Sequence, residues 1–265
     1  MTVVVLAAGR GRRLQASDAA SLRDPAQRVA AAQGLKILMP VGGSARPLLD
    51  HVLGRLASAG CSGATLVVPP DHDPILTHLA RVPPPLPVSL AVQVEPTGTA
   101  GAVAAAAAAV QDESFLVVNG DNLYPEAAVR AMLGVPGWGL AAFTRRSLER
   151  DSGFPPSRVA AFATVSRDAA GWLTGLVEKP PLEALAPDAL VSMNLWRFDR
   201  RVFDACRDVP ASARGERELP DAVLRGVAQG IRVAVLPVEG EVLDLTTAGD
   251  VAVVSRALDR QEVRS

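Results

Sequence analysis

The sequence predicts an α/β fold built around a twisted, mostly parallel sheet. Short apolar runs rich in β-branched residues alternate along the chain with segments that carry a helical pattern of apolar positions. Strands that alternate with helices in this way are typical of βαβ units, whose strands run parallel. The first run, residues 3–7, is apolar at every position, which indicates a strand buried on both faces. With 265 residues, 49% of them hydrophobic, the chain can bury a sizeable core.

The predicted elements follow one another along the whole chain. After residues 3–7, strands are predicted at residues 64–68, 88–94, 115–118, 140–143, 172–177, 191–196 and 231–236. Helices are predicted at residues 48–59, 101–110, 125–133, 219–229 and 248–259. Two segments interrupt the alternation. We expect a loop or short helix that could form a mobile lid at residues 15–34, and an excursion from the sheet at residues 144–157.

Charge and cysteine content exclude several classes of protein. The 27 basic and 28 acidic residues give a formal net charge of −1, so bulk charge predicts neither nucleic-acid nor membrane binding. Cys61 and Cys206 have no neighbour at metal-ligand spacing, so we expect no disulfide framework and no zinc site. No uninterrupted apolar stretch reaches the ~20 residues of a transmembrane helix, and the N-terminal run is too short for a signal peptide. We therefore expect a cytoplasmic protein, for which a homo-oligomer is an open alternative.

A glycine- and arginine-rich loop follows the first predicted strand, with the sequence LAAGRGRRL at residues 6–14. Small residues let backbone N–H groups approach a phosphate closely, and arginines add bidentate contacts. The dinucleotide fingerprint is incomplete because Leu14 occupies its third glycine position, and no Gly-Lys-Ser/Thr of a P-loop follows. Taken alone, the loop indicates phosphate binding about as well as it indicates a surface turn.

Three further motifs place a single charged residue beside apolar residues. In LKILMPVGG, Lys36 is flanked by apolar side chains, so its ammonium is partly held within the structure and could reach an anion. In NGDN, Asp121 follows a buried strand at the sheet edge where ligands bind, Gly120 gives a ligand room, and a carboxylate suits Mg²⁺. In LDLTTAGD, Asp244 requires a partner such as a cation. Each motif taken alone also has an ordinary structural explanation: Lys36 could be a solvated surface lysine, and Asp121 could cap a turn.

The order of the motifs resembles that of the sugar-1-phosphate nucleotidylyltransferases. From residue 3 to about residue 250 the motifs are LAAGRGRRL, LKILMPVGG, EPTGTAGAV, NGDN, EKP, SMN, RGERELPDAV and LDLTTAGD. The resemblance implies a Rossmann-like three-layer sandwich with a mostly parallel mixed sheet, of the nucleotide-diphospho-sugar transferase type. It also implies a single domain over residues 1–265, with a nucleotide-binding half near residues 1–135 and a sugar-phosphate-binding half near residues 136–265.

The same resemblance implies a role for each matching residue. The nucleotide-binding set is Ala8, Gly9, Gly11, Arg12, Glu95, Gly98 and Gly120. The catalytic set contacts phosphates: Arg13 the leaving phosphates, Lys36 the reacting phosphates, and Lys179 the sugar phosphate. The implied cofactor is Mg²⁺, held by Asp121 and Asp244. The sugar hydroxyls are assigned to Glu178 and Asn194.

The implied reaction joins a nucleoside triphosphate to a sugar 1-phosphate or a cyclitol 1-phosphate. An oxygen of the 1-phosphate attacks the α-phosphorus in line, and pyrophosphate leaves. Because this nucleophile is already anionic, the reaction demands charge and positioning and needs no general base. We interpret His51, His72 and His78 as structural or exposed for this reason.

The identity of the base depends on Glu95, which stands where the family often has a base-reading glutamine. A carboxylate only accepts hydrogen bonds, so it suits a base edge with two donors, such as guanine, better than uracil or thymine. The family's Tyr-Gly near the sugar is replaced around residues 161–163, so the sugar is not predicted.

Three alternatives remain beside this function. The chain could transfer nucleotides to a non-sugar phosphate, against which Glu178 and Asn194 argue, or be a non-catalytic sugar-nucleotide-binding subunit. A Rossmann oxidoreductase conflicts with the missing third glycine. Lysine usage favours the enzyme: of the 27 basic residues only Lys36 and Lys179 are lysine, and both fall in the motifs LKILMP and EKP. An ammonium on phosphate is not equivalent to a guanidinium, so replacing either lysine with arginine should impair turnover.

Overall fold

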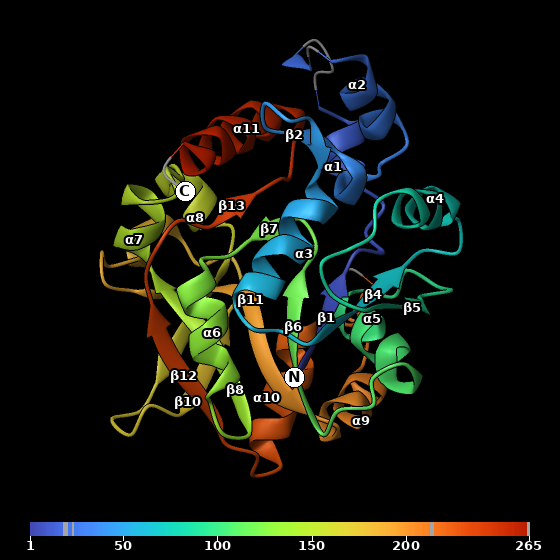
Figure 1. Cartoon of the computed structure of the whole chain (residues 1–265). Coiled ribbons are helices and arrows are strands. Elements are labelled where there is room, and N and C mark those ends of the chain that lie inside the picture. Colours follow the sequence, from blue (N-terminus) through green and yellow to red (C-terminus); the bar gives the residue numbers. More distant parts are fainter. Residues whose placement is uncertain (18–20, 23, 213–214, 264–265) are drawn as a thin grey trace.

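A nine-stranded sheet forms the centre of the molecule in a computed structural model that describes residues 1–17, 21–22, 24–212 and 215–263 (Figure 1). Its strands are β1 (Thr2–Leu6), β4 (Gly63–Val68), β5 (Val88–Val92), β6 (Ser114–Asn119), β8 (Trp138–Thr144), β9 (Ala163–Arg167), β10 (Leu173–Val177), β11 (Leu190–Asp199) and β12 (Val233–Val238). In β1, Val3 and Val5 enter the apolar cluster on one face while Val4 enters that on the other. The strand is therefore buried on both faces, as its unbroken apolar run predicts.

The sheet is mixed, with the order β10-β9-β11-β6-β1-β4-β5 and with β8 joining β11 to β12. The pairs β1–β4, β1–β6, β4–β5 and β8–β12 are parallel. Strand β11 runs antiparallel to β6, β8 and β9, and β10 runs antiparallel to β9. Only β10 and β11 thus oppose the other seven of the nine strands, which confirms the predicted, mostly parallel mixed sheet.

Strand β11 changes its neighbour part-way along its length. Residues 190–192 pair with β9, whereas residues 196–199 pair with β6, and β8 accompanies both parts. The register against β8 shifts between Ser192 and Leu195, and Asn194 lies in this irregularity with a φ of 58°. A left-handed conformation is tolerated better by asparagine than by most residues. The break places Asn194 at the junction of the two groups of strands.

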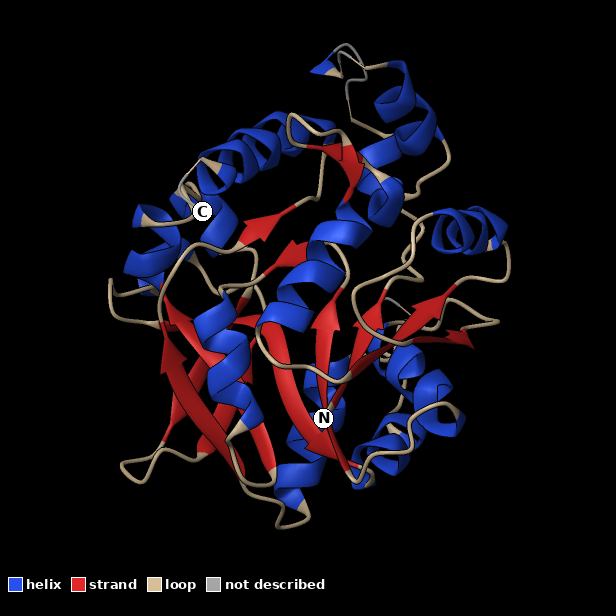
Figure 2. Cartoon of the chain, in the orientation of Figure 1, coloured by secondary structure: helices blue, strands red, loops and turns tan. Residues whose placement is uncertain are grey.

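Helices cover both faces of the sheet and form the predicted three-layer sandwich (Figure 2). On one face, three helices supply side chains to one apolar cluster: α3 (Leu48–Ser58), α6 (Glu126–Leu133) and α11 (Ala248–Glu262). On the other face, a second cluster is built with α5 (Thr99–Ala105), α9 (Arg201–Asp208) and α10 (Leu219–Ala228). The alanine run ends α5 and continues as the 3₁₀ turn Ala106–Ala108, and its small side chains let this segment lie close to the sheet.

Shorter elements complete the chain. The remaining helices are α1 (Arg12–Gln15), α2 (Pro25–Ala32), α4 (Asp73–Arg81), α7 (Arg145–Arg150) and α8 (Pro156–Val159), with 3₁₀ turns at Lys36–Leu38 and Leu182–Ala184. Two small sheets pair β2 (Pro40–Val41) with β3 (Arg46–Pro47) and β7 (Asn122–Leu123) with β13 (Leu243–Asp244). Within the described part of the chain, no helix is long and apolar enough to span a membrane.

Several boundaries differ from those predicted. Helices α4 and α9 and strand β9 were not predicted, and β5 ends at Val92, so that Val94 is 75% exposed. The excursion at residues 144–157 consists of α7 and the start of α8. The segment predicted as a loop or short helix that could form a lid, residues 15–34, contains the short helix α2, which Asp24 caps by accepting a hydrogen bond from the N–H of Ala26. Residues 18–20 and 23 of that segment lie outside the described residues.

Candidate active site

Two adjoining cavities lie where β1 and β6 end. The first, of about 390 Å³, is lined by the glycine–arginine loop, by Lys36 and by residues around the start of α5. The second, of about 860 Å³, extends from the same loop toward α8, β11 and the start of α11. Both cavities share Arg12, Arg13, Thr99, Asn119, Asp121 and Glu216 as lining residues. The two cavities are therefore two parts of one site, and Asp121 is one of the residues at which they meet.

Most of the predicted site residues line these cavities. The first cavity contains Ala8, Gly9, Gly11, Arg12, Arg13, Lys36, Gly98 and Asp121. The second adds Glu178, Lys179, Asn194 and Asp244. The fold thus brings together residues from motifs that lie more than two hundred positions apart in the sequence.

Glu95 and Gly120 line neither cavity. Glu95 is exposed, whereas Gln93, two positions earlier, is buried at the end of β5 and lines the first cavity. The N–H of Gly120 donates to the carbonyl of Leu6 over 2.9 Å, and a Cβ on Gly120 would lie 2.9 Å from the same oxygen. Gly120 therefore permits the close approach of β6 to β1, where the sequence had suggested room for a ligand.

The glycine–arginine loop is fixed by contact between two glycines. Gly11 has a φ of 59°, and a Cβ on it would lie 2.6 Å from the carbonyl oxygen of Gly34. That carbonyl accepts a hydrogen bond from the N–H of Lys36 over 3.0 Å. The pair therefore places the loop directly beside the lysine, and the loop must have glycine at position 11.

Replacing Gly11 with alanine should lower the free energy of unfolding by about 1–3 kcal/mol, because the new Cβ meets backbone in a left-handed conformation. Gly9→Ala in the same loop is the matched control, since a Cβ there would have nothing within 4 Å and should cost less than about 0.5 kcal/mol. Urea unfolding of the two variants measures the difference. Equal losses in the two variants would contradict this role of Gly11.

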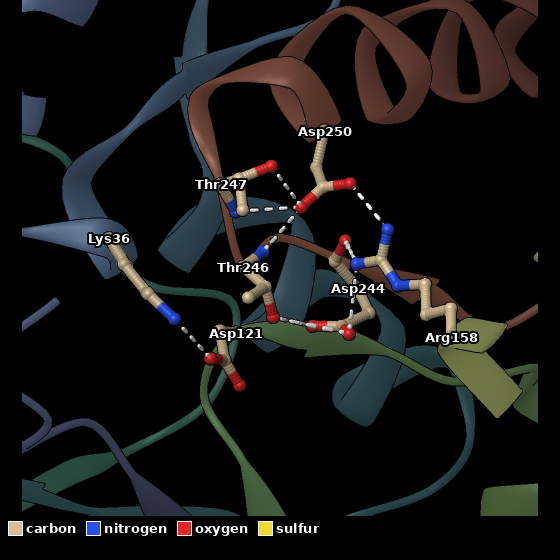
Figure 3. Close-up of polar contacts among 7 residues, drawn as sticks. All are labelled: Lys36, Asp121, Arg158, Asp244, Thr246, Thr247 and Asp250. Carbon is tan, nitrogen blue, oxygen red and sulfur yellow. Dashed lines mark hydrogen bonds and ion pairs between the residues drawn. The ribbon is translucent and has the colours of Figure 1, made fainter. Parts of the chain in front are cut away.

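Lys36 and Asp121 form an ion pair, with Nζ 2.9 Å from Oδ2 (Figure 3). The side chains are 15% and 28% exposed, so both are partly withdrawn from water but remain open to the first cavity. Asp121 follows β6 through Gly120, and the N–H of Leu245 donates to its carbonyl over 2.9 Å. The strand end and the β7–β13 pair together hold this carboxylate in place.

Asp244 is almost completely buried, at 6% exposure, and lies opposite Asn122 in the β7–β13 pair. Burial raises the pKa of its carboxyl above the ordinary value, and the nearby charge of Asp121 raises the pKa further. Hydrogen bonds from Arg158 and Thr246 offset part of this rise. The Asp121 and Asp244 carboxylates therefore stand close enough to repel each other (Figure 3).

The residues predicted to bind the sugar 1-phosphate have a less regular backbone. Glu178 and Lys179 follow β10, are exposed, and line the second cavity, and Lys179 has a positive φ of 47°. Asn194 accepts a hydrogen bond on Oδ1 from the indole N–H of Trp196 over 3.1 Å, which fixes its amide. Among the described residues, two of the three non-glycine residues with positive φ thus belong to this cavity.

Arg217, in the described part (residues 215–221) of the motif RGERELPD, packs against the motif EPTGTAG. The N–H of Arg217 donates to the carbonyl of Thr97 over 2.6 Å, and the N–H of Ala100 donates to the carbonyl of Arg217 over 2.9 Å. A Cβ on Gly98 would lie 2.5 Å from that same carbonyl oxygen, so glycine is required here as well. This contact brings Glu216 to the point where the two cavities meet.

The chain matches the family model described as nucleotidyl transferase over residues 29–248. It belongs to the nucleotidyl transferase family. The resemblance indicated by the order of the motifs is confirmed, and the chain is accordingly an enzyme that transfers nucleotidyl groups.

Other nucleotidyl transferases are similar over most of this chain. A UTP–glucose-1-phosphate uridylyltransferase, AglF of Haloferax volcanii, is 26% identical over 250 residues, covering 92% of this chain and 91% of that protein. The bifunctional protein GlmU of Alkalilimnicola ehrlichii is 28% identical over 279 residues. The alignment with GlmU covers 99% of this chain but only 51% of that protein. A crystal structure of UDP-glucose pyrophosphorylase complexed with UDP-glucose has the same fold, with a TM-score of 0.74, 17% identity and 98% coverage of both chains.

Sequence reasoning gave no role to several residues that line the site of this nucleotidyl transferase. These are Gln93, Thr99, Asn119, Arg158, Ser192, Glu216, Glu218 and Thr246. A signal was available for most of them, because they stand in the quoted motifs: Thr99 in EPTGTAGAV, Asn119 in NGDN, Ser192 in SMN, Glu216 and Glu218 in RGERELPD, and Thr246 in LDLTTAGD. Arg158 lies in α8, between β8 and β9, and belongs to no motif, so only the structure connects it to the site.

Proposed function

We propose that this nucleotidyl transferase joins a nucleoside triphosphate and a sugar 1-phosphate, giving an NDP-sugar and pyrophosphate. One observation carries the proposal: two cavities, each with cationic side chains, meet at a boundary that includes Asp121. A reaction between two polyanions requires such a meeting point, because each substrate needs its own positive charge and the reacting atoms must come together.

The first cavity suits the triphosphate. Arg12 and Arg13 are exposed, and neither makes an ion pair among the described residues, so both guanidinium groups are available to phosphate oxygens. The backbone at Gly9 and Gly11 allows close approach of the phosphates. Lys36 is near enough to Asp121 to reach phosphate oxygens at the meeting point.

The second cavity suits the sugar 1-phosphate. Lys179 would bind its phosphate, while the carboxylate of Glu178 and the fixed amide of Asn194 would bind sugar hydroxyls. From there an oxygen of the 1-phosphate attacks the α-phosphorus. The bond between the α-phosphorus and its bridging oxygen to the β-phosphate breaks, and pyrophosphate carries that oxygen away.

Asp121 and Asp244 fit a magnesium site. Both are hard oxygen donors, and the repulsion between them is the kind that a divalent cation relieves. No group of three or more candidate metal-binding side chains occurs in the described ranges, so the protein would supply two carboxylates while phosphates and water supply the rest. When bound, Mg²⁺ would neutralise charge on the phosphate oxygens.

The base contact belongs to Gln93 in this proposal, because Glu95 is exposed and lines neither cavity. The Nε2 group of Gln93 donates to the carbonyl of Gly98 over 3.1 Å, which leaves its Oε1 and a second N–H for a base. A group with one acceptor and one donor suits uracil or thymine and removes the preference for guanine. The uridylyltransferase relative AglF supports UTP.

Gln93→Ala should therefore raise KM for UTP about tenfold, since a hydrogen bond that reads the base is worth about 1–1.5 kcal/mol. Glu95→Gln is the matched control and should leave the order of preference among UTP, dTTP, GTP, CTP and ATP unchanged. Initial rates with each nucleotide test this. A change of preference in Glu95→Gln, with none in Gln93→Ala, would return the base contact to Glu95.

A substrate panel tests the function itself. Pyrophosphate release should be measured for the five nucleotides crossed with several sugar 1-phosphates and with non-sugar phosphates such as phosphocholine. We expect release only when a nucleotide and a sugar 1-phosphate are both present. Pyrophosphate release with a nucleotide and a non-sugar phosphate, but with no sugar 1-phosphate, would favour a nucleotidyl transferase for non-sugar phosphates. No release with any pair would favour a non-catalytic binding subunit.

A further inference from the structure

Arg158 joins two carboxylates at the edge of the second cavity (Figure 3). Its Nη2 donates to Oδ2 and to the backbone carbonyl of Asp244, both over 3.0 Å. Its Nη1 donates to Oδ1 of Asp250 in a short contact. The planar guanidinium thus uses both arms of its fork on different partners, a geometry that lysine cannot reproduce.

Both partners of Arg158 are anchored. The side chain of Asp250 accepts hydrogen bonds from the N–H of Thr246, from the N–H of Thr247 and from the hydroxyl of Thr247, at 3.0, 2.7 and 3.0 Å. The bond from the N–H of Thr247 is one half of the capping box at the start of α11, in which the Thr247 side chain accepts from the N–H of Asp250 in return. On its other side, the guanidinium lies 4.8 Å from the ring centre of Phe154. Arg158 therefore ties Asp244 to the rigid first turn of a long helix.

The contacts of Arg158 leave Asp244 able to bind a cation. The hydroxyl of Thr246 lies 3.1 Å from Oδ1 and 3.3 Å from Oδ2, while Arg158 donates to Oδ2. Because each carboxylate oxygen can accept two bonds, Oδ1 keeps a free lone pair. Figure 3 shows Arg158 and Lys36 on opposite sides of the two aspartates, so the arginine does not stand between them.

We propose that Arg158 is a positioning residue that holds the Asp244 carboxylate in the orientation required for the divalent cation shared with Asp121. The proposal rests on the proposed function, which requires that cation. Partners of metal ligands that fix the ligand's orientation typically contribute ten- to a hundredfold to metal affinity. Removing Arg158 would leave Asp244 buried with Thr246 as its side-chain donor and free to rotate away from Asp121.

The test is a titration of the full-length protein with Mn²⁺, followed by electron paramagnetic resonance, without nucleotide or sugar phosphate. Asp121→Asn should abolish Mn²⁺ binding at this site. Arg158→Met and Arg158→Lys should each raise the dissociation constant for the same Mn²⁺ ion about tenfold or more. Arg201→Met is the matched control, because it removes an exposed arginine from an ion pair with Asp199 at the end of β11, outside both cavities, and should leave Mn²⁺ affinity unchanged.

Unchanged or tighter Mn²⁺ binding in Arg158→Met would overturn the proposal, since Arg158 would then be a bystander or a competing cation. Full affinity in Arg158→Lys would also overturn it, because charge alone would suffice. So would the absence of any Asp121-dependent Mn²⁺ binding in the wild type. Thermal unfolding of each variant identifies any variant that does not fold, and Arg158→Lys retains the charge if Arg158→Met does not fold. The titration contains no substrates, so its result is independent of whether the proposed reaction occurs.

Discussion

Asp121→Asn is expected to lower kcat by about a hundredfold or more, because it removes the charge at the point where both cavities meet. Asp244→Asn is expected to lower kcat by about tenfold or more, since its amide keeps one oxygen for a cation but loses the charge. Steady-state pyrophosphate release over a range of Mg²⁺ concentrations measures both effects. Part of the loss in Asp244→Asn should be recovered at high Mg²⁺, where weaker binding is saturated.

Asp204→Asn is the control for these two variants. Its side chain is 72% exposed on α9 and belongs to neither cavity, so its kcat should match that of the wild type. Circular dichroism should show that all three variants are folded. Near-full activity of Asp121→Asn in the folded state would contradict the role assigned to the carboxylate pair.

Lys36→Arg is expected to lower kcat about tenfold, and Lys36→Met about a hundredfold, because the ammonium supplies charge to the reacting phosphates. Lys36 is 15% exposed with Nζ 2.9 Å from Asp121, so a longer, planar guanidinium cannot occupy the same position. Lys179→Arg should also impair turnover, with a smaller effect that falls mainly on KM for the sugar 1-phosphate, because its side chain is exposed. Full kinetics with both substrates varied separate these effects.

Arg130→Lys is the reverse substitution and serves as the control. Arg130 is 60% exposed on α6, lines neither cavity, and should exchange for lysine without effect on kcat. The chain uses arginine at 25 of its 27 basic positions. If Arg130→Lys has no effect and Lys36→Arg lowers kcat, the two lysines serve the reaction and are not a result of composition. A wild-type kcat in Lys36→Arg would show that the reaction does not require a lysine at position 36, so that chance alone would explain its presence in a chain rich in arginine.

The fold could be predicted because its signals are local. The unbroken apolar run of β1 indicates a strand that is buried on both faces. The alanine run at the end of α5 indicates a helix that packs closely on the sheet, and the alternation of strands and helices indicates their order. Predictions were weaker where tertiary context decides. Strand β5 is shorter than the predicted strand at residues 88–94 because it lies at the sheet edge, where a continuation at Val94 would remain in water.

The site could be predicted where motif order carries the information and could not where geometry does. The positions of Lys36, Asp121 and Asp244 follow from their motifs, and the structure brings them to one place. That Gln93 lines the first cavity and Glu95 does not depends on the backbone near the end of β5, which the motif does not reveal. Gly120 resembles a ligand-contacting glycine in sequence, yet its lack of a side chain serves the contact between β6 and β1.

Transfer of a labelled α-phosphate tests the central claim most directly. UTP labelled with ³²P at the α-phosphate should be incubated with the enzyme, Mg²⁺ and the sugar 1-phosphate that gives the highest rate in the panel. We expect the label to appear in an NDP-sugar in an amount equal to the pyrophosphate released, and only when the sugar 1-phosphate is present. Label that appears in UMP, or label that stays in UTP with every sugar 1-phosphate, would contradict nucleotidyl transfer to a sugar phosphate at this site.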